Sequence, residues 1–233
     1  MSRKRVIVTT SWDDGHSLID GKLSALLNDY RIKATFYIAK ESMRTPEDIS
    51  NLKILDKNFE IGAHTLLHPD LTKVSLNEAR EEIVGSKKWL EQLLDHEINL
   101  FAYPYGRHNK ELADLIRTSG FIGSRTLNFD TSPPKNPFMI GIGCAASNEG
   151  PLLRLKAALK SKLCLKSLVD WETNAKLLFD RILEKGGVWH LWGHSWQVTI
   201  NDEWDKLEEV FKHVSDNPNV SYVANGQIIN SHP

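Results

Sequence analysis

The chain has 233 residues, of which 41% are hydrophobic and 25% charged, with 29 basic and 30 acidic side chains. This composition excludes a disordered or fibrous chain and is typical of a globular protein with one sizeable core, so we expect a single domain over 1–233. The formal charge of −1 gives no general attraction to nucleic acid or to an anionic membrane, which favours a small substrate.

Short β-branched or aromatic runs alternate with helical patterns along the chain. The helical patterns include 18–30 and 76–94, and the second begins with Ser75 and Glu78 spaced as a capping box. The predicted strands are 5–10, 33–39, 59–64, 98–103, 120–124, 138–143, 187–193 and 220–224. This alternation predicts an α/β fold with a parallel sheet, either open or closed into a barrel.

The two cysteines and the amino-terminal residues give little indication of chemistry. Cys144 and Cys164 have no metal-binding spacing, so we expect two buried or unreactive thiols. A basic start at 3–5 is followed by a short apolar run that ends in Ser-Trp-Asp-Asp, which is not a signal peptide. No stretch approaches membrane-spanning length, and we expect a cytoplasmic protein.

Reactive side chains follow several of the predicted strands. In parallel α/β folds, the carboxyl ends of the strands meet at one edge and hold the functional groups. The residues at these ends are Asp13 and Asp14 after the first strand, His64 and His68 after the third, Tyr103 to Gly106 after the fourth, and His190 and His194 around the end of 187–193.

The spacing of two of these histidines suggests a metal site. His64 and His68 are four residues apart, which predicts both imidazoles on one side of a single helical turn that Pro69 discourages from continuing. Asp14 would complete a set of two histidines and one carboxylate, while Asp13 would point elsewhere and stay free beside the ion. The plainer alternatives are a turn or helix cap for the two aspartates and a solvated helix face for the histidines.

Four motifs together resemble a known family. The sequences TSWDDGH, HTLLHP, FAYPYG and WHLWGHSW, in this order, are similar to the metal-dependent polysaccharide deacetylases of carbohydrate esterase family 4, the NodB-homology domain. The resemblance extends from residue 6 to about residue 200. It implies a distorted (β/α) barrel of seven or eight strands that removes N- or O-acetyl groups from sugars. It also implies a divalent ion, most often zinc, with cobalt, nickel or manganese as alternatives.

The resemblance also implies roles for individual residues. Asp13 matches the catalytic base, and Asp14, His64 and His68 match the metal ligands. The base would take a proton from the attacking water, and the backbone N–H of Tyr105 would help to hold the resulting oxyanion.

The general acid is expected in the last motif, where two histidines compete. Residues 188, 190, 192 and 194 share one face of an extended strand, so His190 and His194 could both point into the site. The family histidine lies at the very end of its strand, which favours His194. His190 would then support it, act as the alternative acid, or be a core histidine.

Two features depart from the family pattern. Ala102 stands where the family often has an arginine that orients the base. Asp170-Trp171 could match the family's Asp-Trp motif or could be a helix start with Asp170 as the N-cap. The tryptophans at 189, 192 and 196 either belong to the core or stack against a sugar ring.

Residues 152–168 form a basic amphipathic pattern. We interpret it as a solvated helix face, with a surface for anionic lipid or a phosphorylated sugar as the sharper alternative.

The leading functional hypothesis is a metal-dependent hydrolase that deacetylates a sugar. One alternative is the hydrolysis of a non-sugar amide or a formamide, and another is a non-catalytic carbohydrate-binding relative. Because we expect a cytoplasmic enzyme, we predict a small acetylated sugar or glycan as the substrate, with no nucleic acid partner and no membrane span.

Overall fold

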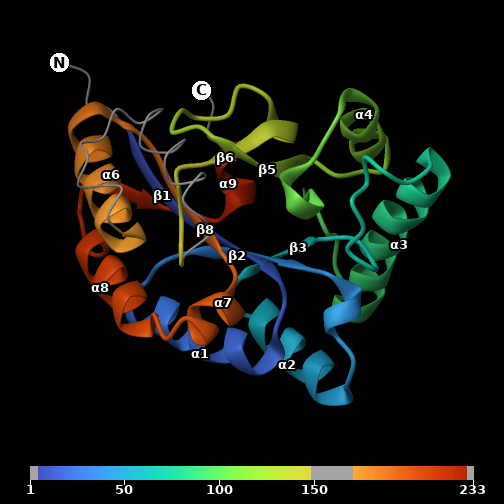
Figure 1. The fold of residues 1–233 in the computed structure, drawn as a ribbon, viewed down its shortest axis with the longest axis horizontal. Coiled ribbons are helices and arrows are strands. Elements are labelled where there is room, and N and C mark those ends of the chain that lie inside the picture. The colour runs from blue at the N-terminus through green and yellow to red at the C-terminus, as the bar shows by residue number, and fades with distance from the viewer. Residues whose placement is uncertain (1–4, 148–169, 230–233) are drawn as a thin grey trace.

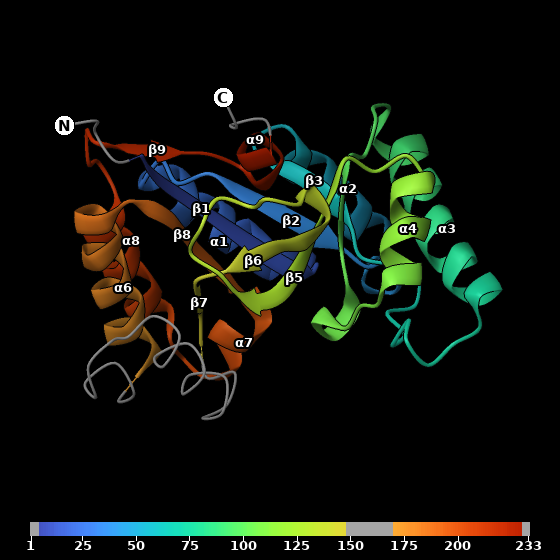
Figure 2. The same cartoon turned by 90° about the horizontal axis from the view of Figure 1, so that it is seen from above.

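The computed structural model describes residues 5–147 and 170–229, and within them one parallel sheet curves into a nearly closed barrel. Helices lie around the outside of this sheet, with α6 and α8 at one end of the molecule and α3 and α4 at the other (Figures 1 and 2). The predicted (β/α) barrel is confirmed. The predicted helix over 152–168 and Cys164 lie outside the described residues.

Every strand pairing in the described sheet is parallel. The order is β6-β5-β4-β3-β2-β1-β8-β7, and β9 pairs with the start of β1. The strands are β1 (Val6–Asp14), β2 (Ala34–Ile38), β3 (Glu60–Ala63), β4 (Leu100–Ala102), β5 (Gly123–Phe129), β6 (Ile140–Ile142), β7 (Cys144–Ala145), β8 (Gly187–Gly193) and β9 (Val220–Tyr222).

The short segment that contains β6 and β7 brings the two edges of the sheet together. β6 pairs with β5, and β7 pairs with β8 directly afterwards in the chain. Between them, the Gly143 N–H donates to the His190 carbonyl at 2.9 Å. Because this one segment pairs with both edges, the carboxyl ends of the strands surround one opening of the barrel, which we call its mouth.

The helices that follow the strands begin at clear capping signals. Thr45 and Ser75 each form a capping box, so the predicted start of the helix at Ser75 with Glu78 is confirmed. The helices are α1 (Ser17–Asp29), α2 (Pro46–Asp56), α3 (Leu76–Leu94), α4 (Lys110–Thr118), α6 (Trp171–Lys185), α7 (Ser195–Ile200), α8 (Trp204–Val214) and α9 (Asn225–Ile229).

Helix α9 packs against β1 and β2 through its first residue. Its first residue, Asn225, is fully buried and accepts a hydrogen bond from Thr9 at 3.0 Å. The Asn225 N–H donates to Thr35 at 2.9 Å, and its side chain donates to Tyr37 at 3.0 Å. Asn225 therefore forms a buried hydrogen-bonded network with side chains of β1 and β2 inside the barrel.

Several predicted strand boundaries were wrong. The first strand runs to Asp14 and not to residue 10, because β2 and β8 pair with it almost to its end. The strand predicted over 120–124 is β5, shifted to Gly123–Phe129 by its pairing with both β4 and β6. The one predicted over 138–143 begins with a 3₁₀ turn, because the Asn136 side chain caps the N–H of Phe138 at 3.0 Å.

Within residues 5–147 and 170–229, no helix combines the length and the apolar character that a bilayer crossing requires.

Candidate metal centre and active site

The two neighbouring aspartates end β1 and point in different directions. Asp13 is 4% exposed and faces the barrel interior, where its register partner on β2 is Tyr37. Asp14 has a φ of 74°, in the left-handed region, and its side chain is 23% exposed at the mouth. The change in backbone conformation between them separates the two carboxylates.

The predicted helical turn between the two histidines is wrong, although the imidazoles do meet. Residues 64–70 are a loop in which Thr65 and His68 have φ values of 71° and 51°. The His68 N–H donates to Thr65 Oγ1 at 3.0 Å, which closes the loop without helical hydrogen bonds. The Nε2 atoms of His64 and His68 lie 3.0 Å apart.

Asp14, His64 and His68 form a group whose ligand atoms all lie within 4.8 Å of one another. Asp14 Oδ1 is 3.7 Å from His64 Nε2 and 3.5 Å from His68 Nε2. His64 Nδ1 lies 2.8 Å from the Ala102 carbonyl, so that nitrogen carries the proton and Nε2 presents a lone pair.

These three residues fit a divalent metal ion. Asp14 Oδ1 is buried and has no hydrogen-bond partner among the described residues, which is costly unless a ligand supplies one. Burial lowers the pKa of His64 to about 4, so its ring is neutral at neutral pH, as a metal ligand must be. Two imidazoles and one carboxylate match the donor set of an open zinc site.

A buried arginine that no sequence motif indicated bonds Asp13. Arg125 on β5 is fully buried, and its Nη2 donates to Asp13 Oδ2. The Trp192 indole N–H donates to the same oxygen at 2.8 Å. Burial by itself raises the pKa of Asp13, but the Arg125 guanidinium and the groups around it outweigh this effect and lower the pKa to about 2. Asp13 is therefore ionised at neutral pH.

The two candidate histidines of β8 and its end occupy different environments. His194 Nε2 lies 3.7 Å from Asp14 Oδ2, and His194 Nδ1 lies 2.9 Å from Gln197 Oε1. His190 is fully buried deeper in the barrel, where its ring nitrogens lie 2.8 Å from Ser11 Oγ and 2.7 Å from the Gly141 carbonyl. Burial lowers the pKa of His190 to about 3. The structure brings His194, and not His190, to the metal ligands.

Tyr105 lies beside His68 at the same centre. It belongs to a 3₁₀ turn, Pro104–Gly106, that directly follows β4. Its ring is 57% exposed and meets the His68 ring at a centroid distance of 4.8 Å. The side chain of the residue predicted to supply the oxyanion donor therefore contacts a metal-ligand candidate.

Left-handed backbone conformations gather at this site. Asp14, Thr65, His68 and Tyr105 all have φ between 51° and 74°, although none is glycine. Each such conformation costs on the order of 1–3 kcal/mol, and such residues persist where surrounding contacts hold them. The strain falls on the three loops that present the candidate ligands and the oxyanion donor.

The remaining predicted residues divide between core and site. Trp189 is core, with its indole N–H on the Ala175 carbonyl at 2.9 Å, whereas Trp196 donates to Asp14 Oδ2 at 3.1 Å. Asp170 is the N-cap of α6 and accepts from the Thr173 N–H at 3.0 Å, as one of the two interpretations predicted. Cys144 is buried, and burial raises the pKa of its thiol.

An open groove of about 450 Å³ runs beside the centre. Asp14, His68 and Trp196 are among the residues that line it. The rest of the lining comes mainly from the polar loop 41–45 and from Asp48. A polar ligand in this groove would reach the metal-ligand candidates.

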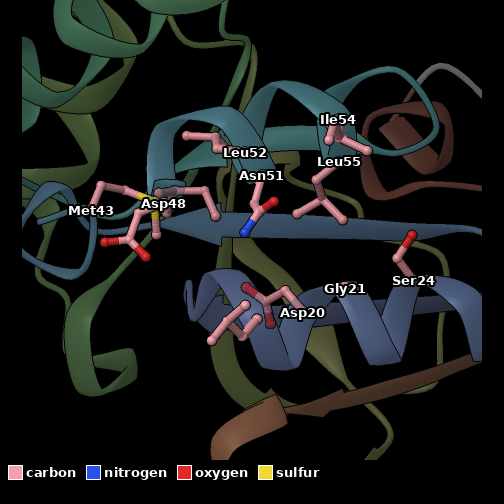
Figure 3. A pocket seen from close by; sticks show the side chains of 11 residues that line it. Asp20, Gly21, Ser24, Met43, Asp48, Asn51, Leu52, Ile54 and Leu55 are labelled. Carbon is pink, nitrogen blue, oxygen red and sulfur yellow. The ribbon is translucent and has the colours of Figure 1, made fainter. Parts of the chain in front are cut away.

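A separate pocket of about 160 Å³ lies between α1 and α2. Figure 3 shows Asp20 on α1 across from Met43, Asp48 and Asn51, with Leu52, Ile54 and Leu55 along the α2 side. Asp20 accepts hydrogen bonds from Ser195 Oγ at 2.5 Å and from the His16 N–H at 2.6 Å. No predicted catalytic or metal-binding residue lines this pocket.

The fold and the centre together define a parallel (β/α) barrel with an Asp-His-His group at its mouth that could hold a metal ion. The family model for polysaccharide deacetylase matches residues 2–122, so the chain belongs to this family. These residues carry all of the metal-ligand candidates. The family is metal dependent in general, which agrees with the donor set at the mouth.

A curated relative supports the same assignment. The chain is 31% identical over 100 residues to a peptidoglycan-N-acetylglucosamine deacetylase of Bacillus cereus. This match covers 42% of the chain and 36% of the relative, so the two proteins correspond over little more than a third of the relative's length.

Solved structures share the fold over almost the whole chain. The Xyl-CE4 domain of a multidomain xylanase from the hindgut metagenome of Trinervitermes trinervoides has a TM-score of 0.65 at 13% identity, over 97% of this chain and 90% of that one. A CE4 family pseudoenzyme from Bacillus anthracis has a TM-score of 0.59 at 14% identity, over 97% and 66% of the two chains. At these identities the likeness concerns the fold alone.

Proposed function

We propose that the protein is a metal-dependent hydrolase that removes an N- or O-acetyl group from a sugar. The observation that carries the proposal is the pairing of an Asp-His-His ligand set with an adjacent carboxylate, Asp13, that Arg125 keeps ionised. Membership of the deacetylase family and the name of the Bacillus cereus relative support a sugar substrate.

Asp14, His64 and His68 would hold the ion, most often zinc in such a set. A bound divalent ion supplies Lewis-acid polarisation of the acetyl carbonyl and acidifies a water. Asp14 Oδ1, with no other hydrogen-bond partner among the described residues, is the carboxylate oxygen available to it.

Asp13 acts as the general base in this proposal. Its pKa of about 2 keeps it ionised, and its Oδ1 accepts no hydrogen bond from the described residues and can take a proton from the attacking water. Such a low pKa makes it a weak base in the ground state, so its contribution rests on its fixed position beside the ligands. His64 Nε2 lies 3.8 Å from Asp13 Oδ2, which places the carboxylate at the edge of the centre.

The remaining groups act on the developing oxyanion and on the leaving group. The backbone N–H of Tyr105 donates to the oxyanion from the loop after β4. His194 protonates the leaving nitrogen or oxygen, and Gln197 orients its ring through Nδ1. His190 has hydrogen-bond partners at both ring nitrogens deeper in the barrel and serves the packing there.

The test is acetate release from acetylated monosaccharides, oligosaccharides, chitin, acetylxylan and peptidoglycan, with formamides and simple amides alongside. Zinc-dependent release from at least one sugar, lost in Asp13→Asn, is expected. Release from the non-sugar amides alone would favour the amide hydrolase. Sugar binding without turnover would favour the non-catalytic relative, an alternative to which the pseudoenzyme of the same fold gives weight.

A further inference from the structure

Two indole N–H groups from one short segment bond the two neighbouring carboxylates, one each. Trp192 donates to Asp13 Oδ2 at 2.8 Å, and Trp196 donates to Asp14 Oδ2 at 3.1 Å. The tryptophans are four residues apart, at the end of β8 and the start of α7. His194 lies between them, with ring centroids 5.1 Å from Trp192 and 5.2 Å from Trp196.

We propose that Trp192 and Trp196 are positioning residues that assign separate roles to the two carboxylates, with Trp196 orienting Asp14 toward the ion and Trp192 keeping Asp13 away from it. We call this pair the tryptophan clamp. The role of Trp196 concerns the metal site alone, whereas the catalytic consequence for Trp192 rests on the proposed function.

The bonding of Asp14 shows how the clamp acts on the metal ligand. Its two oxygens have different neighbours. Oδ2 accepts the hydrogen bond from the Trp196 indole, whereas Oδ1 lies near the Nε2 atoms of His64 and His68. The left-handed backbone at Asp14 does not by itself fix the direction of the side chain. A hydrogen bond to the outer oxygen holds the inner oxygen toward the ion, and outer partners of this kind typically contribute about 10–100-fold in metal affinity.

The bonding of Asp13 is different in kind. Trp192 and Arg125 both donate to Oδ2, the Asp13 oxygen that lies 3.8 Å from His64 Nε2, so the oxygen beside the candidate ligands is already engaged by two hydrogen bonds. An unrestrained carboxylate next to a cation centre would turn toward the ion and become a fourth protein ligand. Holding Asp13 back preserves it as a base and preserves an open position on the ion for substrate.

Three tryptophan-to-phenylalanine variants of the whole chain test the clamp. Trp196→Phe and Trp192→Phe each remove one N–H and keep an aromatic ring. Trp189→Phe is the matched control, because Trp189 lies on the same strand and loses a hydrogen bond to a backbone carbonyl, away from the centre. Thermal unfolding verifies that each variant folds.

The first measurement is zinc affinity, by competition with a chromophoric chelator and without any sugar. We expect Trp196→Phe to bind zinc about 10–100-fold more weakly. We expect Trp192→Phe to bind zinc at least as tightly as the wild type, because Asp13 can then join the ligands, and Trp189→Phe to retain the wild-type affinity. The absorption spectrum of Co²⁺ bound in place of zinc should change in Trp192→Phe, because Asp13 gains access to the ion, and should stay unchanged in Trp189→Phe.

The second measurement is turnover on the best sugar substrate. We expect Trp192→Phe to lose kcat at saturating zinc, while Trp196→Phe recovers much of its activity as zinc is raised. Unchanged zinc affinity in Trp196→Phe, or an equal loss in Trp189→Phe, would overturn the proposal. A wild-type protein that binds zinc but deacetylates no sugar would defeat the proposed function and leave the affinity result for Trp196 standing.

Discussion

Ala102 on β4 and Arg125 on β5 are register partners, and the arginine of this pair reaches Asp13. Partners in adjacent strands project to the same face of the sheet, so both side chains point into the barrel beside the base. The family arginine expected before Pro-Tyr-Gly is absent at Ala102. A guanidinium from the neighbouring strand bonds the same carboxylate instead.

This relationship predicts that Arg125→Met is damaging in two ways. Removing one member of a buried ion pair leaves the other charge without compensation and costs about 3–5 kcal/mol of folding free energy. Asp13 also loses the cation that offsets its burial, so its pKa rises, and it loses the hydrogen bond that fixes its position, so turnover falls. Urea unfolding and the rate of acetate release measure the two effects.

A double variant that moves the guanidinium from β5 to β4 is the control. The double variant Ala102→Arg with Arg125→Ala places a guanidinium at the family position and frees the volume of the original one. It should recover part of the activity that Arg125→Ala alone loses. If the folded double variant recovers no activity, the position of the arginine on β5 is required, and a positive charge at position 102 does not replace it.

The motifs predicted a set of candidate metal ligands that the structure brings together, because His-x₃-His and Asp-Asp are local patterns at strand ends. Arg125 was not predicted, since its role depends on which residue of β5 aligns with Ala102. The predicted strand over 120–124 stopped one residue before it, and alternation in GSRTLNF together with a full β5 would have been the only signal.

The loop between the histidines shows the same limit. A spacing of four residues fits a helical turn, but the left-handed φ values at Thr65 and His68 produce the same meeting of imidazoles by another route. Non-glycine residues in that region are uncommon, so no propensity predicts them. Sequence patterns predicted which side chains meet, while the backbone that presents them depends on tertiary contacts.

Asp13→Asn should bind zinc normally and lose about 10²-fold or more in turnover, as expected for the loss of a positioned base. The amide keeps the shape of the carboxylate but cannot accept the proton. Zinc stoichiometry by elemental analysis and kcat on the same preparation give the answer. Near wild-type turnover in the asparagine variant would remove Asp13 from the mechanism.

His194→Ala and His190→Ala separate the acid from the core histidine. His194 lies 3.7 Å from Asp14 Oδ2, so its loss should reduce kcat, most strongly for N-acetyl substrates whose amine leaves poorly without a proton. His190→Ala should mainly lower the melting temperature, because it removes two buried hydrogen bonds. The opposite pattern of kcat losses would identify His190 as the acid.

Metal binding should depend on each of the three candidate ligands. His68→Ala and His64→Ala remove one imidazole each, and the expected result is loss of stoichiometric zinc from the purified protein together with loss of activity. His96→Ala, which removes an exposed histidine paired with Asp56, is the matched control and should retain the metal. Full zinc occupancy in both ligand variants would exclude this centre.

Asp20 should make the stability of the protein depend on pH in a defined window. Burial raises its pKa from 3.8 to about 6, and the hydrogen bonds from Ser195 and His16 only partly oppose this effect. Below about pH 4 the carboxyl is protonated in both the folded and the unfolded chain, so it contributes no pH dependence there.

Between about pH 4 and pH 6 the unfolded chain loses this proton while the folded chain keeps it, so the free energy of unfolding falls as pH rises. The shift corresponds to about 3 kcal/mol, and above about pH 6 the loss is complete. Asp20→Asn removes the titrating group, so the stability of the variant relative to wild type should rise by about this amount from pH 4 to pH 6.5 and then stay level. Urea unfolding at half-unit pH steps measures it, with the exposed Asp114→Asn as the control for removal of a carboxylate. Parallel curves for wild type and Asp20→Asn over the whole range would contradict the prediction.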